Sequence, residues 1–373
     1  MFEPAVDAAI ERCVAWNIPF AVYAMPGDSE FRFMASMPDS DTGNNRVDFD
    51  EDEFFGINFF NNEEEYLAGV KPRLSASDIL ELDRVKMVLP SGSLPMGHVS
   101  TPRLLYIHRL KSVIAALKRS ATGDKTVVSR LISVFSRIDL CDVARCYFGM
   151  FPETFRYICF TQETGLWLGA TPEVLLEHDA VSHTWRTMSL AGTRRVASVH
   201  PTGWDEKNIT EHDIVTRYIV RTLEQHGLDC SVSVQRELGY GEIEHLCNDI
   251  TASGETDAAD LLYALSPTPA VAGYPLDRAI DMIDMTEMHS RHCYGGFLCV
   301  KSRDGMHAFV NLRCAHVSRL LDGLWHWNIY AGGGVTRDSD PAVEWDETEA
   351  KCRRLLESVN PLDGSVTDVM LPF

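Results

Sequence analysis

The order of strand-like and helix-like segments is the feature that most narrows the fold of this chain. Residues 157–180, YICFTQETGLWLGATPEVLLEHDA, have the pattern of strands joined by tight turns, and residues 184–195, TWRTMSLAGTRR, add another strand with no helix between them. Residues 305–336 have the pattern of a hairpin of long strands. Strands that follow one another directly do not form a βαβ rhythm. We therefore expect an α+β fold with antiparallel sheets.

Helical patterns lie between and after these strand runs. In residues 101–123 apolar residues stand at positions 104, 107, 110, 114 and 117, which is helical spacing, and Gly123 is expected to end this helix. The same reasoning predicts helices at residues 2–17, 208–226, 258–267 and 340–359.

The connector LPSGSLPMGHVSTP, residues 89–102, marks the one internal boundary that the sequence indicates. It separates an N-terminal part, residues 1–99, which includes an acidic, turn-rich stretch at 39–65, from residues 100–373. The chain has 373 residues, 45% of them hydrophobic, which suffices for one large core or two ordinary domains. We expect the two parts to form one structural domain.

Charge and cysteine content narrow the class of protein. The formal net charge is −20, whereas a nucleic-acid-binding protein needs a positive surface. Ten cysteines without a CxxC pair indicate reduced thiols, and the first thirteen residues lack the pattern of a signal peptide. No apolar run approaches the ~18 residues of a membrane span. We expect a cytoplasmic protein that binds neither nucleic acid nor membrane.

The segment EWDETEAK, residues 344–351, concentrates charge near the end of the chain. At 100° per residue Glu344, Glu347 and Lys351 fall on one face of a helix, while Asp346 and Glu349 point away from it. Taken alone, the segment is typical of a solvated helix with a weak i,i+4 ion pair. A site face is the alternative.

A second carboxylate stands on an apolar helix face. Glu211 shares its face with Ile214, Val215 and Tyr218, and a buried carboxylate needs a partner. Asn208 and Glu211 have the spacing of a capping box, which would satisfy that need locally. The other interpretation is a ligand for a hard divalent cation such as Mg²⁺, held together with Glu347.

Two further groups suggest acid–base chemistry. Lys125 heads the apolar strand KTVVSRLISVF, and a lysine that is buried there easily loses its proton. Glu173 lies between a Thr-Pro turn and an apolar run, where a carboxyl group keeps its proton and can act as a general acid. A solvated lysine and an ordinary turn glutamate are the alternatives.

Other segments are less specific. The glycines of YAGGGVT, residues 330–336, would let an anion approach the main chain, or would simply form a turn. Arg313 is expected inside a strand, facing a carboxylate or water. EMHSRHC, residues 287–293, lacks the second ligand pair of a zinc site, so we do not expect zinc there.

Eight segments occur in the order found in the chorismate-utilising enzymes. They are DKTVVSR, LGATPEVLL, LAGTRR, TEHDIV, LSPTPAVAGYP, SRHCYGGF, AGGGVTRDSDP and EWDETEAK. The resemblance covers roughly residues 100–358 and is far more specific than any single motif. It is closest to the isochorismate synthases of menaquinone or siderophore pathways, within a family that includes salicylate, anthranilate and aminodeoxychorismate synthases.

This resemblance implies a fold, a cofactor and roles for individual residues. The fold would be one α+β domain of two large packed antiparallel sheets flanked by helices. Glu211 and Glu347 would hold Mg²⁺, with Glu344 acting through water. Lys125 would be the general base and Glu173 the general acid. Substrate contacts would come from Arg313, Lys351 and backbone groups at Gly332 and Gly334, with Gly192, Thr193, His245, Ala270 and Tyr294 lining the pocket.

Two positions distinguish members of the family. Ala191 stands where aminodeoxychorismate synthases carry a nucleophilic lysine, and Lys125 stands where the amine-using members have a different residue. This combination favours water addition to chorismate. The resemblance then implies that no amidotransferase subunit is needed and that the protein is a monomer or weak homodimer. Salicylate synthases share the combination, so salicylate synthase is one alternative. A catalytically impaired chorismate-binding protein is another.

Four residues depart from the usual pattern of the family without removing a proposed ligand, base or acid. Ser266 replaces a histidine, Asn248 replaces serine or threonine, and Gly333 replaces alanine. His292 replaces a glycine, and its imidazole is expected beside the pocket, where it would narrow the space for substrate.

Overall fold

The computed structural model describes residues 2–37, 46–61, 67–82, 99–120, 125–196, 203–320 and 323–362. Its helices are α1 (Pro4–Trp16), α2 (Ala76–Glu81), α3 (Arg103–Arg119), α4 (Leu140–Met150), α5 (Glu206–Gln225), α6 (Ala258–Leu265), α7 (Leu276–Thr286) and α8 (Pro341–Val359). Its strands are β1 (Phe20–Ala24), β2 (Arg32–Ala35), β3 (Phe54–Ile57), β4 (Ala68–Val70), β5 (Lys125–Ser136), β6 (Phe155–Thr161), β7 (Gly165–Thr171), β8 (Val174–Asp179), β9 (Thr184–Arg195), β10 (Asp229–Val232), β11 (Arg236–Tyr240), β12 (Ile243–Ser253), β13 (Gly273–Tyr274), β14 (Phe297–Ser302), β15 (Gly305–Val310), β16 (Cys314–Arg319) and β17 (Trp325–Val335).

Within these residues the strands form two sheets, and every pairing is antiparallel. Sheet A has eight strands in the order β13-β5-β17-β16-β7-β6-β1-β2. Sheet B has nine, in the order β10-β12-β9-β8-β15-β14-β3-β4, with β11 also paired to β12. The predicted α+β class with two large packed antiparallel sheets is confirmed. Strands from before residue 100 contribute to both sheets, because β1 pairs with β6 and β3 pairs with β14.

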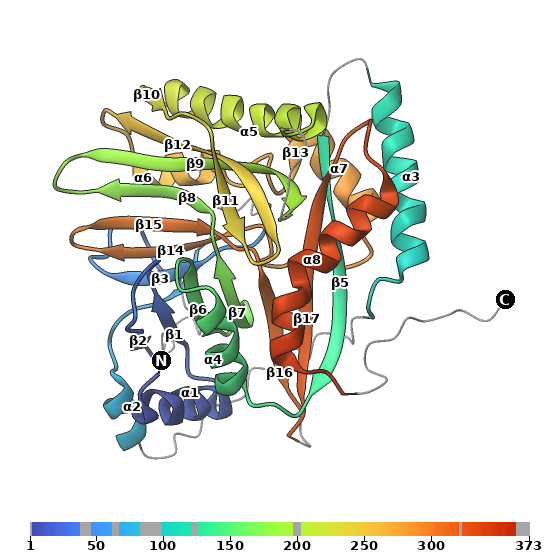
Figure 1. The fold of residues 1–373 in the computed structure, drawn as a ribbon. Coiled ribbons are helices and arrows are strands. Elements are labelled where there is room, and N and C mark those ends of the chain that lie inside the picture. The colour runs from blue at the N-terminus through green and yellow to red at the C-terminus, as the bar shows by residue number, and fades with distance from the viewer. Residues whose placement is uncertain are drawn as a thin grey trace.

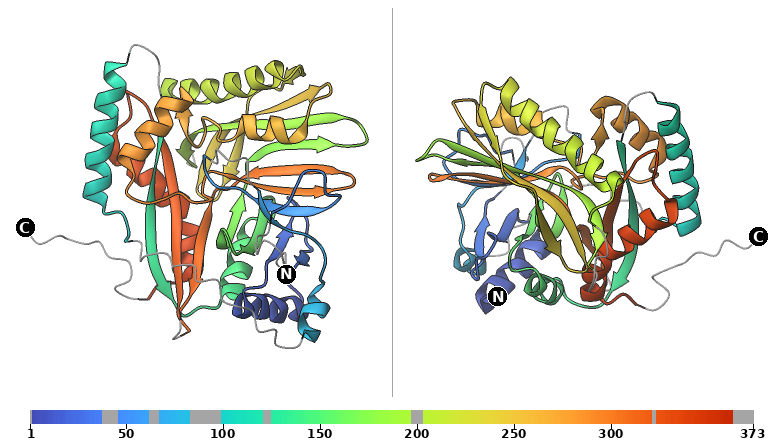
Figure 2. Two further views of the ribbon diagram at one scale, coloured as in Figure 1. Left: turned by 180° about the vertical axis from the view of Figure 1, so that it is seen from behind. Right: turned by 45° about the horizontal axis from the view of Figure 1, so that its top comes forward.

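Helices cover the outer faces of the two sheets. Figure 1 shows α5 along the outside of sheet B, and α8 and α3 beside the long strands β5 and β17 of sheet A. The reverse view in Figure 2 shows α6 lying on the same face of sheet B as α5. A sheet enclosed in this way is buried on both faces, which is why β5 is buried at almost every position instead of alternating. No helix among the described residues combines the length and apolarity that a bilayer span requires.

An aromatic layer fills the space between the sheets. Phe155 of β6 stacks on Phe309 of β15 with ring centroids 4.2 Å apart, and Tyr23 of β1 packs against Phe55 of β3 at 5.8 Å. All four side chains are almost completely buried. Burial of one large apolar side chain contributes about 1.5–3 kcal/mol, so this layer is a major source of cohesion between the sheets.

The chain crosses directly from one sheet to the other at two neighbouring places. One crossing lies between β7 and β8 and contains Glu173, and the other lies between β15 and β16 and contains Arg313. The two run side by side, because the Val310 amide donates to the Glu173 carbonyl at 3.0 Å and the Ala170 amide donates to the Arg313 carbonyl at 3.3 Å. These crossings bring residues of both sheets to one location.

The structure corrects the prediction of a single hairpin for residues 305–336. β16 and β17 do form a hairpin in sheet A, but β15 pairs with β14 and β8 in sheet B. The break falls at Arg313, whose φ of 53° is incompatible with extended strand. The predicted helices agree with the structure to within a few residues. Gly123 and most of the connector at 89–102 lie outside the described residues.

Candidate active site

A pocket opens where the two crossings meet the ends of β5, β9, β12 and β17. Of the residues that the sequence singled out, it is lined by Glu173, Gly192, Thr193, Glu211, His245, Ala270, Tyr294, Arg313, Gly332, Gly334 and Lys351. Lys125, Glu344 and Glu347 lie directly behind this lining, against Gly333 and Gly334. The structure thus brings together, around one cavity, residues from both sheets and from α5 and α8.

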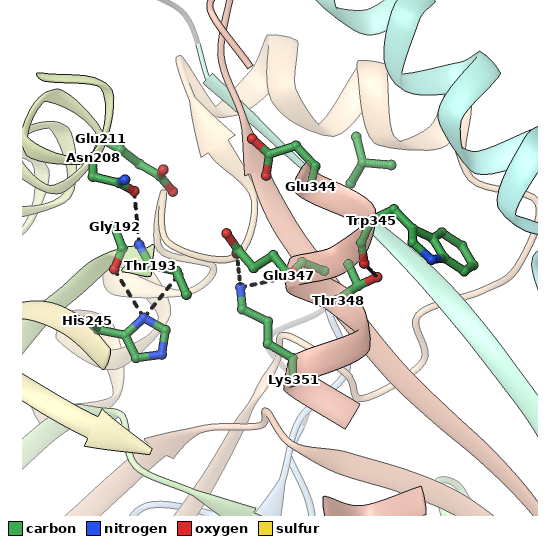
Figure 3. Close-up of polar contacts among 12 residues, drawn as sticks. Gly192, Thr193, Asn208, Glu211, His245, Glu344, Trp345, Glu347, Thr348 and Lys351 are labelled. Carbon is green, nitrogen blue, oxygen red and sulfur yellow. Dashed lines mark hydrogen bonds and ion pairs between the residues drawn. The ribbon is translucent and has the colours of Figure 1, made fainter. Parts of the chain in front are cut away.

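Helix α8 presents Glu344, Glu347 and Lys351 on its site side, the face that helical spacing indicated (Figure 3). The Lys351 ammonium lies 2.6 Å from Glu347 Oε1 and donates to the Gly332 carbonyl at 2.8 Å. Glu344 is buried. Asp346 is exposed on the other side. Glu349 also points away, but instead of facing water alone it forms an ion pair with a buried arginine of β5.

That arginine, Arg130, fixes the position of α8 on sheet A. Its Nε donates to Thr348 Oγ1 at 2.7 Å, and its guanidinium lies 3.9 Å from the centroid of the Trp345 ring. At its N-terminus α8 is capped by Asp340, whose carboxylate accepts from the amides of the first turn. These contacts orient the opposite face of the helix toward the pocket.

Helix α5 begins at a different residue from the one that the capping-box interpretation required. Asp205 is the N-cap, and its carboxylate accepts from the Asn208 amide at 2.8 Å. Asn208 lies inside the helix, where its Oδ1 accepts from the Thr193 amide of β9 at 3.0 Å. The capping-box alternative is therefore wrong, and Glu211 is a buried glutamate that faces the pocket (Figure 3).

Two lysines hold Glu211. Lys125 Nζ lies 3.0 Å from Glu211 Oε1, and Lys207 Nζ lies 3.6 Å from Oε2. Burial alone would raise the pKa of Glu211, but these two ammonium groups outweigh it and the pKa lies below its usual value. Lys207 was not predicted from the sequence, although its i,i+4 spacing from Glu211 on one helix was visible there.

Glycines in β17 make room for these charges. A Cβ atom at Gly334 would lie 2.1 Å from Glu211 Oε1 and 2.9 Å from Lys125 Cε, so a side chain there would displace the ion pair. A Cβ at Gly333 would lie 3.3 Å from Glu344 Oε2 and 3.5 Å from Glu347 Oε1. These glycines lie within a strand, and the turn alternative for YAGGGVT is wrong.

Glu211, Glu344 and Glu347 face one another across the site and suit a hard divalent cation (Figure 3). Glu344 Oε2 is buried and has no hydrogen-bond partner among the described residues. Burial and the neighbouring Glu347 raise the pKa of Glu344 to about 7. An unpartnered buried carboxylate oxygen beside two further carboxylates is the chemistry that a bound Mg²⁺ satisfies. Among the described residues, however, no three carboxylate, histidine or cysteine side chains are gathered closely enough to hold an ion. The match to the metal that the sequence resemblance implied is therefore one of ligand chemistry, and the metal itself stays a prediction.

Glu173 lies in the first sheet crossing and lines the same pocket. Its side chain is buried, and this burial raises its pKa to about 8, although the positive charges of Lys125, Arg313 and Lys351 act in the other direction. The carboxyl group therefore retains its proton at neutral pH. A protonated carboxyl group on a pocket wall is a proton donor.

Arg313 and His245 also line the pocket. Arg313 Nη2 donates to His245 Nε2 at 3.2 Å, which leaves His245 Nδ1 to donate to the Gly192 carbonyl, also at 3.2 Å. The tautomer is assigned from this network. Burial, followed by Arg313 and Lys351, lowers the pKa of His245 well below its usual value, so the ring is neutral. The prediction that Arg313 lies inside a strand is wrong, because it lies in the second crossing.

None of the four departures from the family pattern is part of the pocket lining, although Gly333 lies directly behind it, against Glu344 and Glu347. His292 borders a separate cavity beside Phe60 and Arg291, and its ring lies 6.1 Å from that of His316. The expectation that its imidazole narrows the pocket is therefore wrong. Its φ of 47° explains why glycine is usual at this position. Asn248 Oδ1 lies 2.6 Å from Nε2 of the buried His212, which gives that histidine a polar partner.

Comparisons with known proteins identify the family of the chain. The profile of the family described as chorismate binding enzyme matches residues 58–360. Isochorismate synthase EntC of Escherichia coli strain K12 is 27% identical over 256 residues, which cover 65% of this chain and 64% of that protein. Anthranilate synthase component 1 of Streptomyces coelicolor is 31% identical over 273 residues, which cover 68% of this chain and 51% of that protein.

The fold comparison extends over nearly the whole chain. The structure of MenF, the menaquinone-specific isochorismate synthase from Escherichia coli, superposes with a TM-score of 0.73 at 20% identity, covering 95% of this chain and 91% of that one. In sequence, the matched segments span about half to two thirds of the length of the two curated relatives. Since the family profile matches most of its residues, the chain belongs to the chorismate-binding enzyme family.

Proposed function

We propose that the protein is an isochorismate synthase, which isomerises chorismate by adding water at ring carbon 2 and removing the hydroxyl group at carbon 4. The observation that carries the proposal is the buried Glu173, with a pKa raised to about 8, on the wall of a pocket that also contains a lysine and a carboxylate cluster. Hydroxide is a poor leaving group, and a carboxyl group that is protonated at neutral pH removes this difficulty.

Lys125 is the proposed base. In its neutral form Nζ takes a proton from water as the oxygen bonds to carbon 2. The two ring double bonds shift and the carbon 4–oxygen bond breaks in the same step, and the departing oxygen takes the Glu173 proton and leaves as water. Each proton returns through solvent, so the net change is an isomerisation. Lys125 Nζ lies 3.0 Å from Glu211 Oε1, and it accepts a proton only when this pair opens.

The substrate is a dianion and the protein has a net charge of −20, so binding requires local positive charge. Arg313 and Lys351 supply it on one side of the pocket, with backbone groups at Gly332 and Gly334. Gly192, Thr193, His245, Ala270 and Tyr294 shape the remaining wall.

Mg²⁺ is the proposed cofactor, held by Glu211 and Glu347 with Glu344 beside them. When bound, it supplies positive charge to a substrate carboxylate. The support is the unpartnered Glu344 oxygen and the all-carboxylate donor set. Chelation should remove activity, and full turnover in excess EDTA would contradict this part of the proposal.

Ala191 favours water over a nitrogen or enzyme nucleophile. It lines the pocket with a methyl group and offers no amine. The proposal therefore needs no amidotransferase partner, and we expect a cytoplasmic monomer or weak homodimer.

The test is product analysis by chromatography and mass spectrometry, with purified protein, chorismate and Mg²⁺, with and without ammonium. Isochorismate is expected in both conditions. Salicylate and pyruvate would identify a salicylate synthase, an amino product with ammonium would place the protein among the aminating enzymes, and unchanged chorismate would indicate a binding protein.

A further inference from the structure

Lys207 links the carboxylates of the two helices that face each other across the site. Its Nζ lies 2.9 Å from Glu344 Oε1 on α8 and 3.6 Å from Glu211 Oε2 on its own helix, α5. Among the ion pairs of the described residues, it is the lysine that contacts carboxylates from both helices. It therefore lies in the space between two of the proposed metal ligands.

We propose that the Lys207 ammonium group is an internal counter-ion that competes with Mg²⁺ for Glu211 and Glu344 and must move out when the metal binds. The inference rests on the proposed function, because that function supplies the metal. It assigns a role to a residue that neither base nor acid catalysis uses.

Charge balance supports this competition. The cluster contains three carboxylates, Glu211, Glu344 and Glu347, and three ammonium groups that pair with them, those of Lys125, Lys207 and Lys351. Even with all three carboxyl groups ionised, a divalent cation added to this set would leave two excess positive charges in a largely buried space. Such an excess is unfavourable where the local dielectric is low, so metal binding is most favourable if an ammonium group withdraws.

Exposure indicates which lysine withdraws. The Lys125 side chain is 0% exposed, so moving it would require opening the core around β5. Lys351 is 16% exposed and is also held by the Gly332 carbonyl. Lys207 is 22% exposed, near the start of α5. It is therefore the most exposed of the three, and its flexible four-carbon stem can bring the ammonium group into water.

Two consequences follow for the metal-free protein. Lys207 neutralises carboxylates that would otherwise repel one another, and it links α5 on sheet B to α8 on sheet A. Its removal should therefore weaken the metal-free fold and strengthen metal binding. A residue that merely packed against the site would not have these opposite effects.

The experiment is a calorimetric titration of the full chain with Mg²⁺ alone, without substrate. The variants are Lys207→Met, which removes the charge, and Lys207→Gln, which removes the charge but keeps a donor for Glu344. Arg221→Met is the matched control, because it removes one positive charge from an exposed position on the same helix. We expect both Lys207 variants to bind Mg²⁺ about tenfold more tightly, or better, and the control to stay within about twofold of wild type.

Thermal unfolding supplies a readout independent of affinity. Without metal both Lys207 variants should unfold at a lower temperature than wild type, and saturating Mg²⁺ should raise their midpoint by more than it raises that of wild type. Equal or weaker Mg²⁺ binding by the Lys207 variants would overturn the inference. Equal tightening in Arg221→Met would also overturn it, because bulk charge would then explain the effect.

Glu211→Gln separates this inference from the proposed function. If that variant binds Mg²⁺ like wild type, the proposed metal site itself is wrong. If it loses Mg²⁺ binding while the Lys207 variants show no tightening, the metal site stands and only the competition is wrong.

Discussion

Two buried glutamates line the pocket, and their pKa values are shifted in opposite directions. Burial raises the pKa of Glu173 to about 8. Burial acts on Glu211 in the same direction, but Lys125 and Lys207 lie within 3.0 and 3.6 Å and bring its pKa below the usual value. One carboxyl group is kept neutral and the other ionised, although both are shielded from water.

The difference shows that neighbouring charges, and not the depth of burial, set the protonation state of each glutamate. Positive groups also lower the pKa of Glu173, but none of the described lysines or arginines forms an ion pair with it. Pairs of titratable groups with pKa values pushed apart mark the acid and the ionised partner of many active sites. The same substitution, Glu to Gln, should therefore have opposite effects on stability at Glu173 and at Glu211.

The largest effect is expected for Glu211→Gln. It leaves the fully buried Lys125 without its anionic partner, and breaking a buried ion pair from one side costs about 3–5 kcal/mol. Turnover should fall to background because a proposed metal ligand is lost. Urea unfolding at pH 7 measures the stability change. Asp346→Asn, exposed on α8, is the control and should change stability by less than about 0.5 kcal/mol. Wild-type stability in Glu211→Gln would show that the ion pair does not form.

Glu173→Gln is expected to lower turnover about 10²–10⁴-fold, the usual contribution of a general acid, while leaving chorismate binding largely intact. The amide keeps the size and polarity of the neutral carboxyl group but has no proton to give. Steady-state kinetics and equilibrium binding measure the two quantities separately. Turnover within tenfold of wild type would remove Glu173 from the role of acid.

The pH dependence of stability and of turnover tests the same group, Glu173. For Glu173 the folded-state pKa, about 8, exceeds the ordinary value of 4.5. The stability that its proton provides is therefore fully present below about pH 4.5 and is lost as the pH rises through about 8. Relative to wild type, Glu173→Gln should gain stability across that window and then level off. Wild-type turnover should also fall above about pH 8, and a profile still rising at pH 9 would contradict the assignment.

The smallest effect is expected for His292→Gly. His292 does not line the pocket. Relief of a left-handed conformation, about 1–2 kcal/mol, opposes the roughly 0.5–1 kcal/mol that glycine costs through its flexibility when unfolded. Stability should therefore change by no more than about 1.5 kcal/mol, and turnover should not fall. Complete loss of turnover at unchanged stability would mean that His292 takes part in the chemistry.

Local patterns predicted much of this structure. Uninterrupted strand runs indicated the antiparallel sheets, and helical spacing placed Glu344, Glu347 and Lys351 on one face, because both depend on short-range periodicity. The capping box failed because Asp205, three residues before Asn208, is the stronger cap in its actual context. Arg313 was assigned to a strand because its left-handed φ has no signature in neighbouring residues.

Contacts between residues far apart in the sequence were harder to predict. The Lys125–Glu211 pair joins residues 86 apart in sequence (211 minus 125), and no local pattern announces it. The link from Lys207 to Glu344 is of the same kind, although the i,i+4 relation of Lys207 to Glu211 could have marked it as a candidate. The partner of Glu349, a buried arginine on β5, could not be foreseen because it depends on how α8 docks.

The two neighbouring sheet crossings have a mechanical consequence. Because the chain is covalently continuous there, and backbone hydrogen bonds join one crossing to the other, we expect the two sheets to move least relative to each other at this junction. Glu173 and Arg313 lie in it. Thermal motion of the outer strands should therefore leave the spacing of these two groups nearly unchanged. We expect the chemistry to tolerate loosening at the sheet edges better than loosening at the junction.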